Sequence, residues 1–145
     1  MTGPSSARLA RALDALGADS ERVGENTWSV RLPSVKRGAI TVGILCAERT
    51  ASFNAFFMRG PDRGHVDVYR GLLRKNLDLH DWRFAVDDDG DLFLAAAVAV
   101  SELSEARLDE LLGALVFAVD ETFEGVLRTG FEVPEGAIVG ERPEA

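Results

Sequence analysis

Three stretches of the chain repeat apolar residues every three or four positions, the spacing that places them on one face of an α-helix. The first begins near residues 5–6, a pair of serines that can cap a helix, and ends before Gly17. The second covers about residues 66–79, and the third covers about residues 104–127, with Ser104 as its capping residue. The pattern therefore predicts three amphipathic helices.

Five further stretches have the composition and the short length of β-strands. They are residues 27–32, 40–47, 51–58, 82–86 and 91–100. The first of them alternates, with Trp28, Val30 and Leu32 on one side, which indicates a half-buried strand. The last two flank an Asp-Gly pair at 89–90, which is typical of a tight hairpin turn. Residues 19–26 are polar, and we expect them to form a turn.

The predicted elements follow one another in the order α-β-β-β-α-β-β-α. Strands that come in runs joined by short turns favour an α+β fold, in which an antiparallel five-stranded sheet packs against three helices. Residues 1–130 are predicted to form a single domain, since the length fits one hydrophobic core. Glycine and proline punctuate residues 131–145, so we expect an extended or disordered tail there.

Sorting the predicted strand positions by parity separates two faces of the sheet. One face is almost entirely apolar and is expected to be the core face. The other, called the second face below, would be polar if it met water. Its large apolar positions are instead Leu45, Phe56, Met58 and Phe93. Such a patch is unusual on a monomer, so the chain's own helices, a second copy or a segment of a partner protein should cover it.

Composition and charge narrow the function. The chain is 46% hydrophobic and 28% charged, as globular domains are, and its 24 acidic and 16 basic side chains give a net charge of −8. A negative surface disfavours nucleic acids and anionic membranes as partners. The single cysteine, Cys46, lies in an apolar run and is expected to be structural. Neither a secretory signal nor a membrane-spanning run is visible, so we expect a cytoplasmic protein.

No set of residues has the spacing of a catalytic or metal site. The acidic cluster comprises Asp87, Asp88, Asp89 and Asp91, and it fails the pattern of a calcium-binding loop. We expect a solvated hairpin tip there. His65 and His80 lie fifteen residues apart, and neither a nucleophile elbow nor a phosphate-binding loop is present. Asp120 and Glu124 are assigned to the solvated side of the third helix. We expect a non-enzymatic chain without a catalytic residue, metal or other cofactor.

Several segments resemble the YbjN family of bacterial proteins, labelled as sensory transduction regulators. They are residues 73–76 (LRKN), 82–94 (WRFAVDDDGDLFL), 108–112 and 120–123. The family is similar in fold to type III secretion chaperones, and the resemblance would cover about residues 6–130. It implies a type III secretion chaperone-like fold, a homodimer and a protein or peptide client, with no cofactor.

We therefore expect a protein- or peptide-binding module that holds an apolar segment of a partner on the second face. The residues expected to contact that partner are Leu45, Phe56, Met58 and Phe93. Aromatic and methionine side chains suit this role because they provide large, adaptable contact areas. The alternative is a regulatory sensor that binds a small ligand in a pocket between the sheet and the third helix.

Overall fold

The computed structural model describes residues 3–131, which form three helices, a short 3-10 turn and six strands. The helices are α1 (Pro4–Leu16), α2 (His65–Lys75) and α3 (Glu105–Gly130). The strands are β1 (Asp19–Gly24), β2 (Thr27–Ser34), β3 (Gly38–Cys46), β4 (Thr50–Met58), β5 (Arg83–Val86) and β6 (Leu92–Ala99). The expected tail, residues 131–145, lies outside the described residues except for Phe131.

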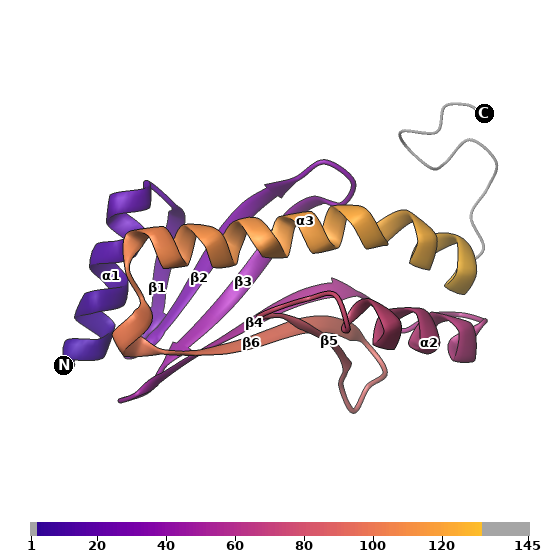
Figure 1. The fold of residues 1–145 in the computed structure, drawn as a ribbon, viewed down its shortest axis with the longest axis horizontal. Helices are drawn as coiled ribbons and strands as arrows, with labels where there is room; N and C mark the ends of the chain where they lie inside the picture. The colour runs from indigo at the N-terminus through magenta and orange to yellow at the C-terminus, as the bar shows by residue number, and fades with distance from the viewer. Residues whose placement is uncertain (1–2, 132–145) are drawn as a thin grey trace.

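The six strands form one antiparallel sheet in the order β1-β2-β3-β4-β6-β5. Helix α3 crosses the sheet, and α1 lies beside the beginning of α3 (Figure 1). The α+β class, the three helices and the antiparallel pairing are confirmed. The predicted number of five strands is wrong, because the segment that follows α1 is also a strand.

That additional strand, β1, was expected to be a turn because nearly all of its side chains are polar. Asp19 pairs with Arg31 and Glu21 pairs with Ser29, so β1 is an edge strand that hydrogen-bonds only to β2. Five of its six residues are exposed. An edge strand with both sides in water needs no apolar alternation, and its charges discourage pairing with other chains. The pattern of hydrophobic residues therefore cannot predict β1.

The core lies between one face of the sheet and helices α1 and α3. On α3 the buried residues recur at helical spacing, as Leu108, Leu111, Leu115 and Val119. Opposite them, Phe53 and Trp82 meet edge to face with their rings 6.0 Å apart, and the Trp82 indole N–H donates to the Leu111 carbonyl at 2.9 Å. Burying that indole leaves its polar atom satisfied, as a packed core requires.

The ends of the helices follow the expected signals in part. Ser104 caps α3 by accepting a hydrogen bond from the Arg107 N–H at 3.1 Å, and Gly17 ends α1 in the left-handed conformation at φ 67°. Helix α3 continues to Gly130, three residues past the expected end. Helix α2 ends at Lys75 rather than near residue 79.

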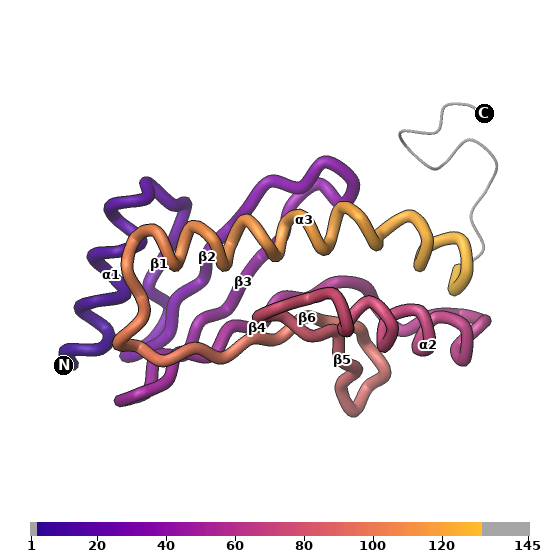
Figure 2. Tube along the Cα trace, in the orientation of Figure 1, coloured from indigo at the N-terminus to yellow at the C-terminus, as the bar shows by residue number. Residues whose placement is uncertain are grey.

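Two polar contacts fasten α1 to the segment that precedes α3, although almost a hundred residues separate them in sequence. Arg8 donates from Nε to the Leu103 carbonyl at 3.1 Å and from Nη2 to the Ser101 carbonyl at 3.0 Å. The Cα trace shows the two segments side by side (Figure 2). Arg8 thereby satisfies carbonyl groups that precede the first turn of α3.

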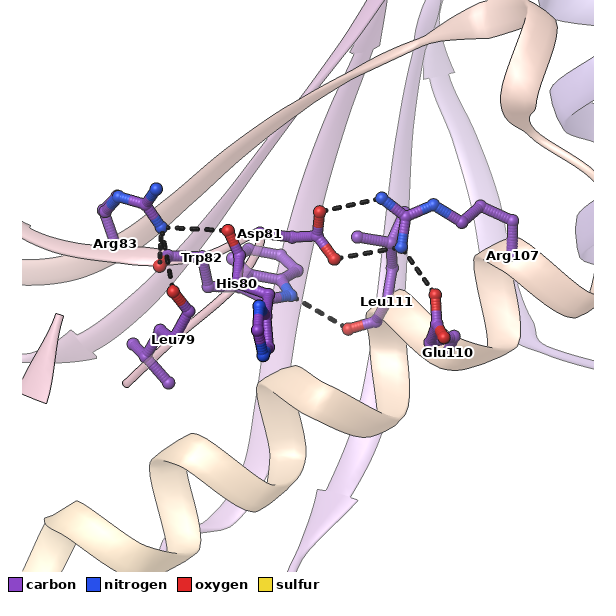
Figure 3. A network of polar contacts seen from close by, with 8 residues as sticks. All are labelled: Leu79, His80, Asp81, Trp82, Arg83, Arg107, Glu110 and Leu111. Carbon is purple, nitrogen blue, oxygen red and sulfur yellow. Dashed lines mark hydrogen bonds and ion pairs between the residues drawn. The ribbon is translucent and has the colours of Figure 1, made fainter. Parts of the chain in front are cut away.

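An ion pair attaches the loop before β5 to α3 (Figure 3). Both terminal nitrogens of the Arg107 guanidinium donate to the Asp81 carboxylate, at 2.7 and 2.9 Å. Glu110 accepts a third hydrogen bond from Arg107 at 2.6 Å. The bidentate bond from Arg107 holds the pKa of Asp81 below its usual range, against the opposing effect of burial. The folded protein therefore favours the charged form of Asp81.

We predict that Asp81→Asn removes part of the pH dependence of stability. Because the pKa of Asp81 is lowered by folding, its contribution is present above the ordinary aspartate pKa of about 4 and is lost as the pH falls through the lower folded value. The variant should be less stable at neutral pH by about 1–2 kcal/mol. That difference should shrink in urea unfolding at acidic pH. A constant difference would contradict the assignment, and Asp88→Asn in the exposed hairpin turn is the control.

The side chain of Asn76 occupies the free edge of the sheet at β5. Its Oδ1 accepts from the Phe84 N–H at 2.8 Å and its Nδ2 donates to the Phe84 carbonyl at 3.2 Å. These two backbone groups point away from β6, so the amide substitutes for one residue of a neighbouring strand. The Asn of the LRKN segment therefore has a structural role in this fold.

We predict that Asn76→Ala lowers the free energy of unfolding by about 1–2 kcal/mol, because two backbone groups of Phe84 lose their partners. Urea denaturation measures this directly. Asn54→Ala is the matched control, since Asn54 is exposed on β4, and its effect should stay within about 0.5 kcal/mol. Equal effects of the two substitutions would rule out the edge contact.

Candidate functional site

Among residues 3–131, no helix covers the second face of the sheet. Exposed and buried residues alternate strictly along β3 from Ile40 onward, and along β4 as far as its last two residues. The exposed set belongs to this face. Helices α1 and α3 both pack on the core face, while α2 contacts α3 and β5. Of the three covers considered, the chain's own helices are thus not found on this face within the described part of the chain.

Small side chains make the middle of the second face a flat floor. Across the sheet, Gly43 pairs with Asn54 and Asn54 pairs with Ala95. In the next row, Leu45 pairs with Ser52, which pairs with Ala97. Short side chains allow another polypeptide to approach the sheet closely. Leu45, with 55% of its surface exposed, stands at one side of this floor.

Two aromatic side chains lie at the other side of the floor. Phe56 on β4 pairs directly with Phe93 on β6, and Phe56 remains 46% exposed. The guanidinium of Arg37 stands 5.5 Å from the centre of the Phe56 ring. Arg37 also donates to the Phe57 carbonyl at 2.8 Å, and its partial burial lowers its pKa. Phe56 is therefore held in place from one side and open to solvent on the other.

Met58 does not belong to the second face. The pairing of β4 with β6 shifts between Phe56, which meets Phe93, and Met58, which meets Leu92. Such a bulge adds one residue to a strand and reverses the alternation beyond it. Met58 is consequently 7% exposed and lies in the core, so the prediction that it shares a face with Phe56 is wrong. The structure brings Leu45, Phe56 and Phe93 together on the second face.

The charges near the second face are of mixed sign. On the β1 side, Asp19 pairs with Arg31 and Glu21 lies one row further along. On the β5 side, Arg83 pairs with Ala95. Although the net charge of the chain is −8, this face has arginines at both sides. A bound segment with either positive or negative side chains could therefore form ion pairs around the apolar floor.

A second apolar surface lies on α2, where the sequence pattern indicated a face directed at the core. Val68 and Leu72 do face the core, but the neighbouring stripe of α2 is directed to solvent. Its exposed members, called the α2 stripe below, are Val66, Leu73 and Leu77, the last just beyond the helix end. Tyr69 lies at the border of the stripe and is partly buried against the core. The sequence could have revealed two stripes, because apolar residues occupy adjacent positions on this helix as well as positions three or four apart.

The acidic hairpin and the acidic pair of α3 both have structural roles. Asp87 accepts hydrogen bonds from the backbone of Asp89 and Asp91 at 2.9 Å each, which orders the turn. Asp120 accepts a hydrogen bond from the Ser34 hydroxyl at 2.5 Å and another from the Lys36 backbone N–H at 3.1 Å. The assignment of Asp120 to a solvated helix side is therefore wrong. No group of three potential metal ligands occurs within residues 3–131.

The space between the sheet and α3 is filled by core side chains, so a small-ligand pocket would have to lie elsewhere. One hollow of about 270 Å³ opens between the connection from α2 to β5 and α3. Trp82 and Phe117 contribute to its lining together with charged groups such as Lys75 and Glu121, which form an ion pair at 2.8 Å. No helix in the described part of the chain is long and apolar enough to cross a membrane.

The chain belongs to the YbjN family, which confirms the resemblance. The family's model, described as "Putative bacterial sensory transduction regulator", matches residues 5–128. An uncharacterized protein of Mycobacterium tuberculosis is 33% identical over 102 residues, which are 70% of this chain and 56% of that protein. An uncharacterized protein of Mycobacterium leprae is 30% identical over 102 residues, 70% of this chain and 55% of that one. The matched region thus spans about half the length of these relatives.

Solved structures with the same fold include secretion chaperones. The Yersinia pestis type III secretion chaperone SycH, in complex with a stable fragment of YscM2, has a TM-score of 0.53 at 18% identity, covering 79% of this chain and 96% of that one. A chain of the ExsC–ExsE complex has a TM-score of 0.57 at 20% identity, covering 86% of this chain and 96% of that one. The expected chaperone-like fold is confirmed.

We predict that the two apolar residues Met58 and Leu45 differ sharply in their effect on stability. Met58→Ala should lower the free energy of unfolding by about 2–5 kcal/mol, because it leaves a cavity in the core. Leu45→Ala should change it by no more than about 0.5 kcal/mol, because the side chain is mostly in water. Guanidinium denaturation of both variants tests the placement of the bulge, which a mild effect of Met58→Ala would refute.

Proposed function

We propose that this member of the YbjN family is a non-enzymatic protein-binding module that holds an apolar segment of a partner protein on the second face. The observation that carries the proposal is the floor of small residues between Leu45 on one side and Phe56 with Phe93 on the other, which no helix within residues 3–131 covers. We include a homodimeric state in this proposal.

Leaving this apolar face in water has a free-energy cost. Burying apolar surface contributes roughly 25 cal/mol per Å², and exposed phenylalanine and leucine side chains are the largest available sources of it here. The face is also rigid, since it consists of paired strands backed by a packed core. Binding of a partner therefore costs little conformational entropy on this surface, which is already ordered.

The fold also supports a protein ligand. Both solved structures of similar fold contain a second protein, YscM2 in one and ExsE in the other. Identities of 18% and 20% carry over the fold and no binding residue. The residues assigned to binding are thus taken from the exposed face of this chain alone.

Crosslinked affinity purification from host lysate, using the wild type and two matched variants, tests the proposal. Phe56→Ser removes an exposed aromatic ring from the second face, and Phe117→Ser removes one from the outer side of α3. The partner recovered with the wild type should then be purified and titrated against all three proteins by calorimetry. We expect Phe56→Ser to weaken its binding about ten-fold or more and Phe117→Ser to leave it unchanged.

Two results would contradict the proposal. A partner that binds Phe56→Ser as well as the wild type would not use the second face. Loss of binding in Phe117→Ser alone would move the site to the hollow beside α3. Circular dichroism and urea midpoints of both variants must match the wild type, so that lost binding is not lost folding.

A further inference from the structure

Three arginine side chains line one hollow at the end of the molecule where α1 begins. The hollow has a volume of about 600 Å³ and lies among the first two turns of α1, the turn between β3 and β4, and the 3-10 turn that follows β6. Figure 2 shows these segments close together near the N-terminus. Arg8 and Arg11 come from α1 and Arg49 comes from the β3–β4 turn. We call this site the arginine hollow, and its volume is typical of small-molecule sites.

The charge of the arginine hollow is opposite to that of the whole chain. Among the described residues that line it, Glu48 is the only acid, so three guanidinium groups and one carboxylate leave a formal charge of +2. The chain as a whole carries a net charge of −8. Within residues 3–131, none of the three arginines forms an ion pair with a carboxylate. Their mutual repulsion costs free energy, which an anion bound between them would relieve.

Arg8 is held in position before any ligand binds. Its Nε and Nη2 donate to the carbonyls of Leu103 and Ser101 at 3.1 and 3.0 Å, and neutral carbonyls leave its positive charge uncompensated. Its other terminal nitrogen, Nη1, has no hydrogen-bond acceptor among residues 3–131. A guanidinium fixed in this way loses little conformational entropy when it binds an anion.

Hydrogen bonds also tie the walls of the arginine hollow to one another. The Ser5 hydroxyl donates to the Glu48 carbonyl at 2.7 Å, and the Val100 N–H donates to the Arg49 carbonyl at 2.8 Å. Helix α1 begins here at Pro4, and no side chain caps its first turn. The positive end of the helix dipole therefore adds to the potential of the arginines. The hollow is thus a preformed part of the fold with a locally positive potential.

We propose that the arginine hollow binds the phosphate group of a small phosphorylated molecule. A phosphate monoester carries a charge of about −1.5 to −2 at pH 7, which matches the charge of the hollow. Its tetrahedral oxygens accept hydrogen bonds from several directions, and guanidinium groups bind them in pairs of such bonds. A carboxylate has less charge and two oxygens in one plane, so it suits three converging arginines less well. This site is independent of the partner-binding role proposed for the second face.

Calorimetric titration of the 145-residue chain with inorganic pyrophosphate tests the proposal, in about 0.15 M salt to screen nonspecific attraction. One pyrophosphate should bind per chain, with a dissociation constant of roughly 0.1–1 mM because the hollow is open to solvent. The double variant Arg11→Gln with Arg49→Gln should bind about ten-fold more weakly or worse. The matched control is Arg70→Gln with Arg74→Gln, which removes the same charge from exposed positions on α2 and should leave binding unchanged.

Four results would overturn the inference. Saturable binding could be absent up to about 10 mM pyrophosphate. Both double variants could weaken it equally, which would show general electrostatic attraction and no site. A hexaglutamate peptide could bind more tightly than pyrophosphate, which would assign the hollow to an acidic protein segment. Vesicles containing phosphatidic acid could retain a chain that does not bind pyrophosphate, which would assign it to a lipid headgroup. Urea midpoints of both double variants should match the wild type, since all four side chains are exposed.

Discussion

The packing of α3 across one face of the sheet is the constraint on which the rest of the structure depends. Its buried leucines and valines fill the space above β2, β3 and β4, and polar contacts fix it along its length. Arg107 holds the loop before β5, Asp120 holds the turn after β2, and the Gly130 carbonyl accepts from the backbone of Asp62 and Arg63. Since α1 joins it on the same side, no helix of residues 3–131 lies on the opposite face of the sheet.

Periodicity was sufficient to predict the helices, five of the strands and the existence of a second apolar face, because each of these depends on burial. It could not predict β1, whose hydrogen bonds to β2 need no buried side chain. It also misplaced Met58, since a bulge of one residue leaves no mark on composition and yet exchanges the two faces. Of the four large apolar residues assigned to the second face, Leu45, Phe56 and Phe93 therefore lie on it and Met58 does not.

The orientation of α2 shows a different limit. Val68 and Leu72 form one apolar stripe, and Val66 and Leu73 belong to the adjacent one, so both lie within the apolar arc that a helical pattern detects. Which stripe faces the core depends on the position of α3, and α3 lies some forty residues further along the chain. Asp120 is a similar case, because its partner Ser34 is distant in sequence and is brought near only by the packing of α3 on the sheet.

The second face consists of strands and the α2 stripe belongs to a helix, so the two apolar surfaces lie on different elements of the fold. A homodimer, as proposed above, would carry two copies of the second face. Two apolar segments of one partner chain could then bind at once, and the second would bind intramolecularly at a high effective concentration. Weak apolar contacts at each face would then combine into a high overall affinity, although the floor around Leu45 and Phe56 is no larger. Self-association would in this way determine how tightly the module holds an extended partner.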